Sequence, residues 1–395
     1  MTKRYFTFLT EAKKVHVTTG HLDHVTHFYS DPLSAFKHFQ NAMAVFQGKK
    51  SKGTISQKAD GGMSVKAVRF PNGMYGVGYK TGEIFTDEDQ IAATGKEHYV
   101  RSLVPVLNAV RSMEGFQPGT GFQFDLLHQS DEPTKKSKVS QPNTIFYKIP
   151  KDTHLSIAAH SQYAVDDDGV MRKVSSTPDV SQLQAPGVHA PMLAMGEHLG
   201  LQLHPNRRKA IEEHLASARG LLNPKLMKFA RTLMTGKGHH PKFSAFHDQY
   251  HSHSSRTSGE RSVQEMRDYI KQFVNKKAQH PNRRKTETDE QYAARVEEAK
   301  TKLSRELNSH IDNHESRFHT LFAAHNHLIN AKHHLLDQMR EHEGQFQLQT
   351  HNGEEHEGFV SSIGNPGTDE RMAKFVREGS TGFPKKNHNN PKFAR

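Results

Sequence analysis

Apolar residues near the start of the chain follow a helical period once and then a strand period three times. The segment 33–46 carries apolar residues three or four positions apart, follows Asp31-Pro32 and stops before Gly48, which predicts an amphipathic helix. Alternation with a period of two then predicts strands at 54–58, 63–70 and 74–80, the last two joined by a turn at Asn72-Gly73. A second helix is expected from Lys96 to Met113.

Further along, short strand-like runs give way to a long helical region. Strands are predicted at 122–127, 144–149 and 155–159, with a polar loop at 130–141, and the Ser-, Pro- and Asp-rich segment 166–204 reads as a linker. Helices dominate 205–343, and the segment 287–342 keeps the clearest 3.6-residue apolar period. Strand-like sequence returns at 346–348, 358–360 and 373–376.

These patterns predict an α+β fold in which an antiparallel β-rich domain is interrupted by a large α-helical insertion. The expected parts are the first portion of the β-rich domain (1–165), a linker or irregular segment (166–204), the helical insertion (205–343), the last strands (344–378) and an extended tail (379–395).

Composition indicates a partner and excludes several classes of protein. Lysine and arginine number 54 against 42 acidic residues, and the formal net charge of +12 favours a polyanion, nucleic acid before membrane. The chain has no cysteine, which excludes disulfides, thiolate zinc sites and cysteine nucleophiles. No apolar run suits a signal peptide or a membrane span, so we expect a cytoplasmic protein. The sequence does not indicate an oligomeric state.

The tetrapeptide Lys58-Ala59-Asp60-Gly61 follows a predicted strand and carries the clearest chemistry. A lysine amine becomes a nucleophile when cationic neighbours or desolvation lower its pKa, and glycine lets the backbone turn closely under a nucleotide. The tetrapeptide resembles the Lys-x-Asp-Gly motif of the covalent nucleotidyltransferases, the superfamily of polynucleotide ligases and mRNA capping enzymes. The resemblance implies Lys58 as nucleophile and Asp60 and Gly61 as nucleotide-binding residues, with Ser56 at the adenine edge.

In that superfamily an acid, an aromatic ring, a Glu-Gly strand and a lysine strand follow the nucleophile in order. The matching residues here are Asp125, Phe146 or Tyr147, Glu357, and Lys374 with Arg377.

The resemblance gives each of them a role. The aromatic ring would stack on the base, Asp125 and Glu357 would hold Mg²⁺, and Lys374, together with Lys80 or Arg377, would neutralise the phosphates of ATP.

The resemblance therefore implies an ATP-grasp-like ligase domain that uses ATP and Mg²⁺ and forms a lysyl-AMP intermediate. An RNA ligase is preferred over a DNA ligase or capping enzyme, because those carry an oligonucleotide-binding barrel after the last motif and few residues follow Lys374 here. The alternative is a nucleic-acid-binding or structural accessory protein with a vestigial nucleotide pocket.

The chain also departs from the superfamily pattern. Met63 stands where many relatives have arginine, the last motif reads Lys-x-x-Arg instead of Lys-x-Lys, and the gap between Asp125 and Glu357 is long. The whole motif order also resembles uncharacterised tailed-phage proteins, which would place the protein in the host cytoplasm.

Two further features belong to the predicted helical insertion. The hexapeptide His-Pro-Asn-Arg-Arg-Lys occurs at 204–209 and again at 280–285, and Arg207, Arg208, Arg283 and Arg284 are candidate nucleic-acid contacts. Plain solvation of these arginines is the alternative. Among the 30 histidines, His310 and His314 have the spacing of two metal ligands on a helix, but His314 lies on the apolar stripe, where packing is the preferred interpretation.

Overall fold

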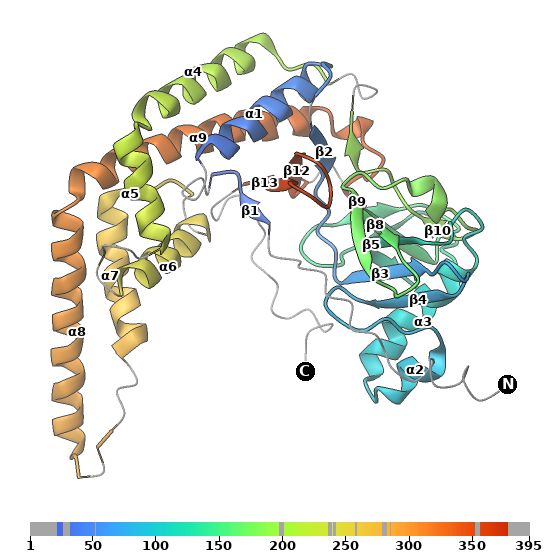
Figure 1. Ribbon diagram of the computed structural model, residues 1–395, viewed down its shortest axis with the longest axis horizontal. Coiled ribbons are helices and arrows are strands. Elements are labelled where there is room, and N and C mark those ends of the chain that lie inside the picture. The colour runs from blue at the N-terminus through green and yellow to red at the C-terminus, as the bar shows by residue number, and fades with distance from the viewer. Residues whose placement is uncertain are drawn as a thin grey trace.

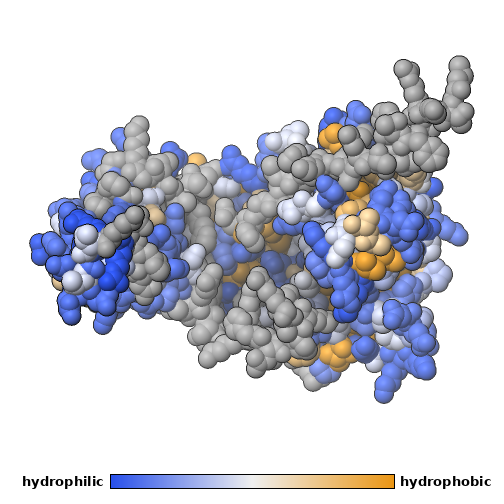
Figure 2. Space-filling model, turned by 90° about the horizontal axis from the view of Figure 1, so that it is seen from below, coloured by the Kyte–Doolittle hydropathy of each residue, from blue (hydrophilic) through white to orange (hydrophobic). Residues whose placement is uncertain are grey.

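The computed structural model describes residues 22–26, 32–51, 53–196, 201–235, 239, 242–256, 259–278, 283–284, 286–351 and 356–377. These residues form a mixed α/β fold with two larger, mostly antiparallel sheets and a long set of helices (Figure 1). The tail expected at 379–395 lies outside them. Among the helices that the structure describes, none is long and apolar enough to cross a membrane. On the face seen in Figure 2, hydrophilic side chains predominate and hydrophobic ones form small separate patches.

The first sheet joins strands from opposite ends of the described chain. Its order is β1 (Asp23–His24), β13 (Arg371–Val376), β12 (Gly358–Ile363), β2 (Gly53–Gln57) and β11 (Ala194–Met195). The central strand β12 runs antiparallel to both of its neighbours, and Val360 lies opposite Ser56 on one side and Lys374 on the other. Of the predicted C-terminal strands, β12 therefore pairs with the strand that precedes Lys58, and β13 pairs with β12.

The second sheet is built from residues 64–189, which follow β2 in the chain. Its order is β10 (Val188–His189), β8 (Leu155–Val165), β5 (Thr120–Gln129), β3 (Ser64–Arg69) and β4 (Tyr75–Tyr79), with β9 (Met171–Ser175) paired to β8. The hairpin of β3 and β4 turns at Gly73, whose φ of +87° suits glycine. Helices α2 (Glu88–Ala93) and α3 (Glu97–Arg111) follow, and α3 packs apolar residues such as Leu107 against this sheet.

Four segments differ from the sequence-based expectation. The expected linker at 166–204 instead supplies β9, β10 and β11 to the two sheets. The polar loop at 130–141 contains a strand, β6 (Lys138–Ser140), which pairs with β7 (Tyr147–Ile149). The strand β7 covers only the second half of the run 144–149, which was predicted to be a strand throughout. The run 346–348 forms no strand, although Phe346 and Leu348 are buried. The strands β6, β7, β10 and β11 have only two or three residues, too few for an alternating pattern to identify, whereas the five-residue β9 lies in a Ser-, Pro- and Asp-rich segment that suggested a linker.

A set of helices fills the region predicted as the insertion, and we call residues 205–341 the helical arm. It comprises α4 (Pro205–Leu221), α5 (Pro224–Thr235), α6 (Phe243–Arg256), α7 (Val263–Ala278), α8 (Asp289–Asp312) and α9 (Glu315–Glu341). In Figure 1, α4 and α9 run beside α1 (Pro32–Phe46), and α8 turns steeply away from α9. One apolar core continues from the helical arm through α1 into the first sheet.

The segment predicted as the strongest helix is two helices. A capping box of Thr288 and Gln291 starts α8, and the chain leaves helical geometry at His314, where φ is −129° and ψ is 13°. The predicted apolar stripe is buried on both sides of this break, for example at Leu307 and Phe318. Periodicity therefore identified the buried face but not the bend within it.

The ring of Phe375 makes the junction between the first sheet and α1 sensitive to substitution. It is fully buried, stacks on Phe359 with ring centroids 4.4 Å apart and meets Phe39 edge-on at 5.1 Å. We expect Phe375→Ala to lower the free energy of unfolding by about 3–5 kcal/mol, because it leaves a cavity. Urea denaturation measures this loss. In the control Val174→Ala, at a half-exposed residue of β9, the change should stay within about 0.5 kcal/mol. Similar losses in both variants would contradict the proposed junction.

Candidate nucleotide-binding site

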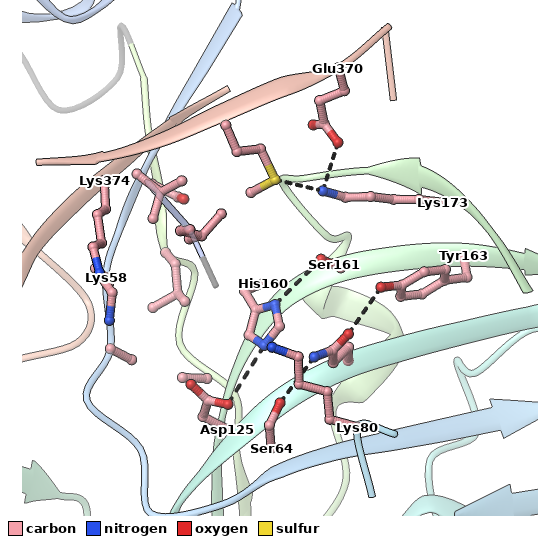
Figure 3. A pocket seen from close by; sticks show the side chains of 18 of the residues that line it. Lys58, Ser64, Lys80, Asp125, His160, Ser161, Tyr163, Lys173, Glu370 and Lys374 are labelled. Atoms are coloured by element: carbon pink, nitrogen blue, oxygen red, sulfur yellow. Dashed lines mark hydrogen bonds and ion pairs between the residues drawn. The ribbon is translucent and has the colours of Figure 1, made fainter. Parts of the chain in front are cut away.

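A pocket of about 780 Å³ lies between the two sheets (Figure 3). Its volume falls in the range of small-molecule and cofactor sites. Both sheets supply its walls, and the polar lining residues most relevant to the chemistry are Ser56, Lys58, Ser64, Lys80, Asp125, His160, Lys173, Glu370 and Lys374. The pocket therefore brings together residues that lie far apart in the sequence.

Backbone pairing places Lys58 at this pocket. The chain leaves β2 directly before Lys58, whose backbone N–H donates to the carbonyl of Gly358 at 2.9 Å. That bond continues the β2–β12 ladder by one step and brings Lys58 beside Glu357, with which its amine forms an ion pair. Gly61 follows where a Cβ atom would come within 2.2 Å of the Cβ of Asp125, so only glycine allows the loop to pass this closely.

The carboxylate of Glu357 is buried, and its surroundings disfavour its charged form. Its side chain is 11% exposed, and burial raises its pKa to about 6 although the adjacent Lys58 and the charge of Lys374 act in the opposite direction. One oxygen contacts Lys58, and the other, Oε2, has no hydrogen-bond partner among the described residues. A buried carboxylate oxygen without a donor is suited to a cation.

Asp125 supplies a second acid from the opposite sheet. It lies on β5 across from Ser64 of β3, and His160 of β8 approaches its Oδ1 to 3.6 Å. Burial works to raise the pKa of Asp125, but hydrogen bonds from His160 and Ser64 and the charges of His160 and Lys58 hold it below the ordinary value. Asp125 is therefore an anion at neutral pH, with oxygen atoms suited to Mg²⁺.

A row across the first sheet presents cationic and polar groups to the same pocket. Ser56, Val360 and Lys374 lie opposite one another on β2, β12 and β13, and all three line the pocket. Lys80, which follows β4, lines it from the second sheet. The pocket lining thus contains two acids, Asp125 and Glu370, and several lysines, while Glu357 lies outside the lining beside Lys58. This combination suits a phosphorylated ligand bound with a divalent ion.

Several of the predicted residues lie outside the pocket lining. Asp60 accepts hydrogen bonds from Asn143 Nδ2 at 2.6 Å, Thr144 N at 2.7 Å and Ile145 N at 3.2 Å, so its carboxylate holds the loop at 143–145. Tyr147 is fully buried, and its hydroxyl accepts from the backbone N–H of Asp60 at 2.7 Å.

Phe146 and Arg377 also lie outside the lining. Phe146 precedes β7, and its carbonyl accepts from His351 N at 2.8 Å. Arg377 forms an ion pair with Asp337 of α9 and so connects the end of β13 to the helical arm. The second cation of the Lys-x-x-Arg motif is therefore directed to α9.

Sequence reasoning missed several residues that line the pocket. Tyr163 and His160 lie on β8, and Lys173 on β9 forms a 2.7 Å ion pair with Glu370. Hydrogen bonds from Lys173, Ser176 and Ser362 hold the pKa of Glu370 down against the effect of burial, which would raise it. His160 directly follows the predicted strand 155–159, but the sequence did not show that this strand lies beside the strand that carries Asp125. The sequence gave no signal for Lys173, because its strand, β9, lies in the segment that was expected to be a linker.

The four candidate nucleic-acid arginines lie on the helical arm and have partners of their own. Arg207 pairs with Glu341 at 2.6 Å, Arg208 with Glu212 at 2.8 Å and Arg283 with Asp289. The backbone N–H of Arg284 donates to Glu287 at 3.1 Å. The contacts of these arginines with nucleic acid stay a prediction.

The fold and pocket define a mixed α/β protein with a polar, cation-rich site between two mostly antiparallel sheets. Residues 20–392 match a family described as a family of unknown function (DUF6267), and the chain belongs to this family. No curated protein and no solved structure matches this chain.

The hydrogen bonds of Asp60 predict a structural role that can be separated from ligand binding. In Asp60→Asn, an NH₂ group replaces one of two carboxylate oxygens that both accept hydrogen bonds, so in either amide orientation a donor faces a donor, and the negative charge that strengthens the remaining bonds is lost. We expect the free energy of unfolding at neutral pH to fall by about 1–3 kcal/mol in urea denaturation. The same change at the exposed Asp131 should have little effect. Unchanged stability of Asp60→Asn would contradict this role.

Proposed function

We propose that the protein is an ATP-dependent nucleotidyltransferase similar to RNA ligases, which acts through lysyl-AMP and joins polynucleotide ends. The observation that carries the proposal is the convergence of Lys58, Asp125, Glu357 and Lys374 on one side of the chain's two-sheet interface. Lys58, Asp125 and Lys374 line the pocket there, and Glu357 is paired with Lys58. These four residues match the superfamily motifs in order and come from four different strands or strand ends.

In the proposed reaction the amine of Lys58 attacks the α-phosphorus of ATP. A nitrogen–phosphorus bond forms, the bond to the bridging oxygen breaks and pyrophosphate leaves. The amine must give up its protons, and Glu357 Oε1, in contact with it and with a pKa of about 6, is placed to receive one. AMP would then pass to a 5′-phosphate end, and a 3′-hydroxyl would displace it.

The remaining pocket residues supply charge neutralisation and position. Lys374 and Lys80 would contact phosphates, and Glu357 Oε2 and Asp125 would hold a Mg²⁺ ion. A bound Mg²⁺ ion would offset the charge that develops on the phosphate oxygens. The oxygen donor set fits this ion, as does Oε2, which has no hydrogen-bond partner in the part of the chain that the structure describes. With Phe146 outside the lining, we assign the ring that faces the base to β8, where His160 and Tyr163 line the pocket.

The polynucleotide substrate rests on the resemblance and on the net charge of +12, and RNA is preferred over DNA. The second candidate is a nucleic-acid-binding accessory protein that retains the pocket without catalysis. The ion pair of Lys58 with Glu357 is compatible with either function, so covalent labelling is the measurement that separates them.

The proposal predicts covalent labelling of Lys58. Incubation with α-³²P-labelled ATP and Mg²⁺ should attach radioactive AMP to the protein through an acid-labile phosphoramide. Lys58→Ala should remove the label, because it removes the only atom that forms this bond. Lys151→Ala, at an exposed lysine outside the pocket, is the matched control and should label like the unmodified chain. If neither ATP nor GTP ever labels the unmodified protein, the accessory-protein function replaces the enzyme.

The raised pKa of Glu357 predicts both a pH dependence and an effect on stability. At limiting ATP, the labelling rate reports free-enzyme groups and should fall about tenfold per pH unit below pH 6, where Glu357 is protonated. Glu357→Gln should lower labelling by about 100-fold or more.

Stability provides the control for this variant. A folded pKa raised from 4.5 to about 6 stabilises the protein below pH 4.5, and that contribution disappears as the pH rises through 6. The Glu357→Gln variant, whose side chain is neutral at every pH, should therefore be no less stable than the unmodified protein at pH 8.

The matched control for the labelling experiment is the exposed Glu114, which is also followed by glycine, and Glu114→Gln should be labelled like the unmodified protein. An equal loss of labelling in Glu357→Gln and Glu114→Gln would refute the role of Glu357.

A further inference from the structure

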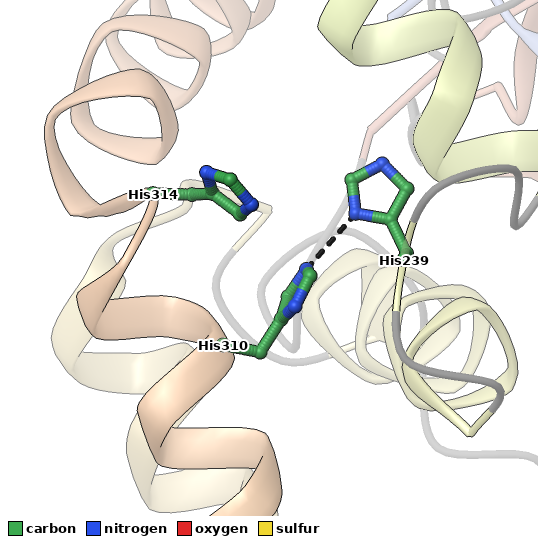
Figure 4. A group of neighbouring side chains, drawn as sticks. All are labelled: His239, His310 and His314. Atoms are coloured by element: carbon green, nitrogen blue, oxygen red, sulfur yellow. Dashed lines mark hydrogen bonds between the residues drawn. The ribbon is translucent and has the colours of Figure 1, made fainter.

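Three histidines meet in the helical arm, outside the pocket between the sheets. His239 lies between α5 and α6, His310 in the last turn of α8, and His314 at the start of α9. One ring nitrogen from each lies within 4.8 Å of those of the other two, and Figure 4 shows the rings directed toward a common space. The helix break at His314 contributes to this arrangement.

Hydrogen bonds orient the ring of His239. The hydroxyl of Thr232 donates its proton to the carbonyl of Phe229 at 2.7 Å, so it acts as acceptor toward His239 Nε2, which lies 2.9 Å away. Nε2 of His239 therefore carries the proton, and the unprotonated Nδ1 points to His310 Nε2 at 2.9 Å. A metal-binding imidazole has this arrangement: one nitrogen is fixed by an outer hydrogen bond and the other offers a lone pair.

An aromatic shell surrounds the three rings. The ring centroid of Phe243 lies 4.1 Å from that of His310, and Phe229 lies 5.3 Å from His314 and 5.7 Å from His239. Phe243 is fully buried and Phe229 nearly so. This shell limits both water access and ring rotation. The positively charged Arg317 stacks over Phe229 and is exposed, so solvent screens its charge.

We propose that His239, His310 and His314 bind one Zn²⁺ ion, with water as the fourth ligand. Imidazole nitrogens suit zinc, which binds them at about 2.0–2.1 Å, so the ligand nitrogens of a tetrahedral site are roughly 3.3 Å apart. The present separations, from 2.9 Å up to 4.8 Å, bracket that value, and small ring movements reach it. The proposal is independent of the nucleotidyltransferase function.

Such an ion would connect three parts of the helical arm. It would fix the bend between α8 and α9 and attach that bend to the segment between α5 and α6. Binding to the folded arm but not to an unfolded chain stabilises the fold by mass action. The expected role is therefore structural.

The test uses the full chain, freed of metal with a chelator and checked by elemental analysis. Titration with Zn²⁺ against a chromogenic competitor should give one tight site per chain, with a Kd below about 1 μM, and raise the melting temperature. Co²⁺ in place of Zn²⁺ should give the visible absorption bands of a tetrahedral site. Absence of a tight site or of these bands in the unmodified protein would overturn the proposal and leave a metal-free packed cluster.

Variants assign the site among the 30 histidines of the chain. His239→Gln and His314→Gln should each weaken Zn²⁺ binding by about 100-fold and remove the Co²⁺ bands. The matched control is His327→Gln, in the same helical arm, where Nδ1 of His327 lies 3.1 Å from Nδ1 of His214, and the Zn²⁺ affinity of this variant should not change. Circular dichroism verifies that each variant is folded. Tight binding that survives in both folded ligand variants would place the ion elsewhere and refute this assignment.

Discussion

The antiparallel pairing of β2 with β12 is the constraint on which the rest of the structure depends. It joins the residues directly before Lys58 to those directly after Glu357, although most of the chain separates them. Closing a connection of this length costs conformational entropy that grows only slowly with the number of residues, so a large intervening region is tolerated. The pairing is supported from one side by the rings of Phe359 and Phe375, which pack with Phe39 of α1. The pocket lies on the row of residues that this pairing sets in register.

That constraint also shapes the helical arm. Because β2 and β12 are neighbours, the chain that leaves the sheets has to return to nearly the same place. The arm satisfies this by running α4 out and α9 back side by side. Its two ends are held together where the backbone N–H of His204 donates to Gln338 at 3.0 Å and Arg207 pairs with Glu341. An arginine proposed from sequence as a nucleic-acid contact thus also closes the base of the arm.

Much of the fold was predictable wherever a segment carried its own periodic signal. The helix α1, the strands around Lys58 and the buried stripe of α8 and α9 all appear where the alternation or helical spacing of apolar residues indicates. Strands of two or three residues contain no period and were not predictable, and the five-residue β9 was missed because the Ser-, Pro- and Asp-rich segment around it suggested a linker.

For the candidate site, the sequence predicted which residues come together better than it predicted which partners their side chains contact. The motif order indicated Lys58, Asp125, Glu357 and Lys374, and these do converge. The orientation of a side chain depends on packing from distant segments, which is why Asp60 turned out to bind the loop at 143–145, and Arg377 a carboxylate of α9.

The continuous apolar core has a consequence for how the molecule is assembled. Residues of the helical arm, of α1 and of the first sheet bury one another's surfaces in a single cluster, so none of them retains its core without the others. A chain shortened by deletion of residues 205–341 would expose Phe359 and its neighbours to water instead of leaving a free-standing two-sheet domain. We therefore expect the arm and the first sheet to unfold as one cooperative unit, and the ion pair of Asp337 with Arg377 connects the arm to the end of the strand that carries Lys374.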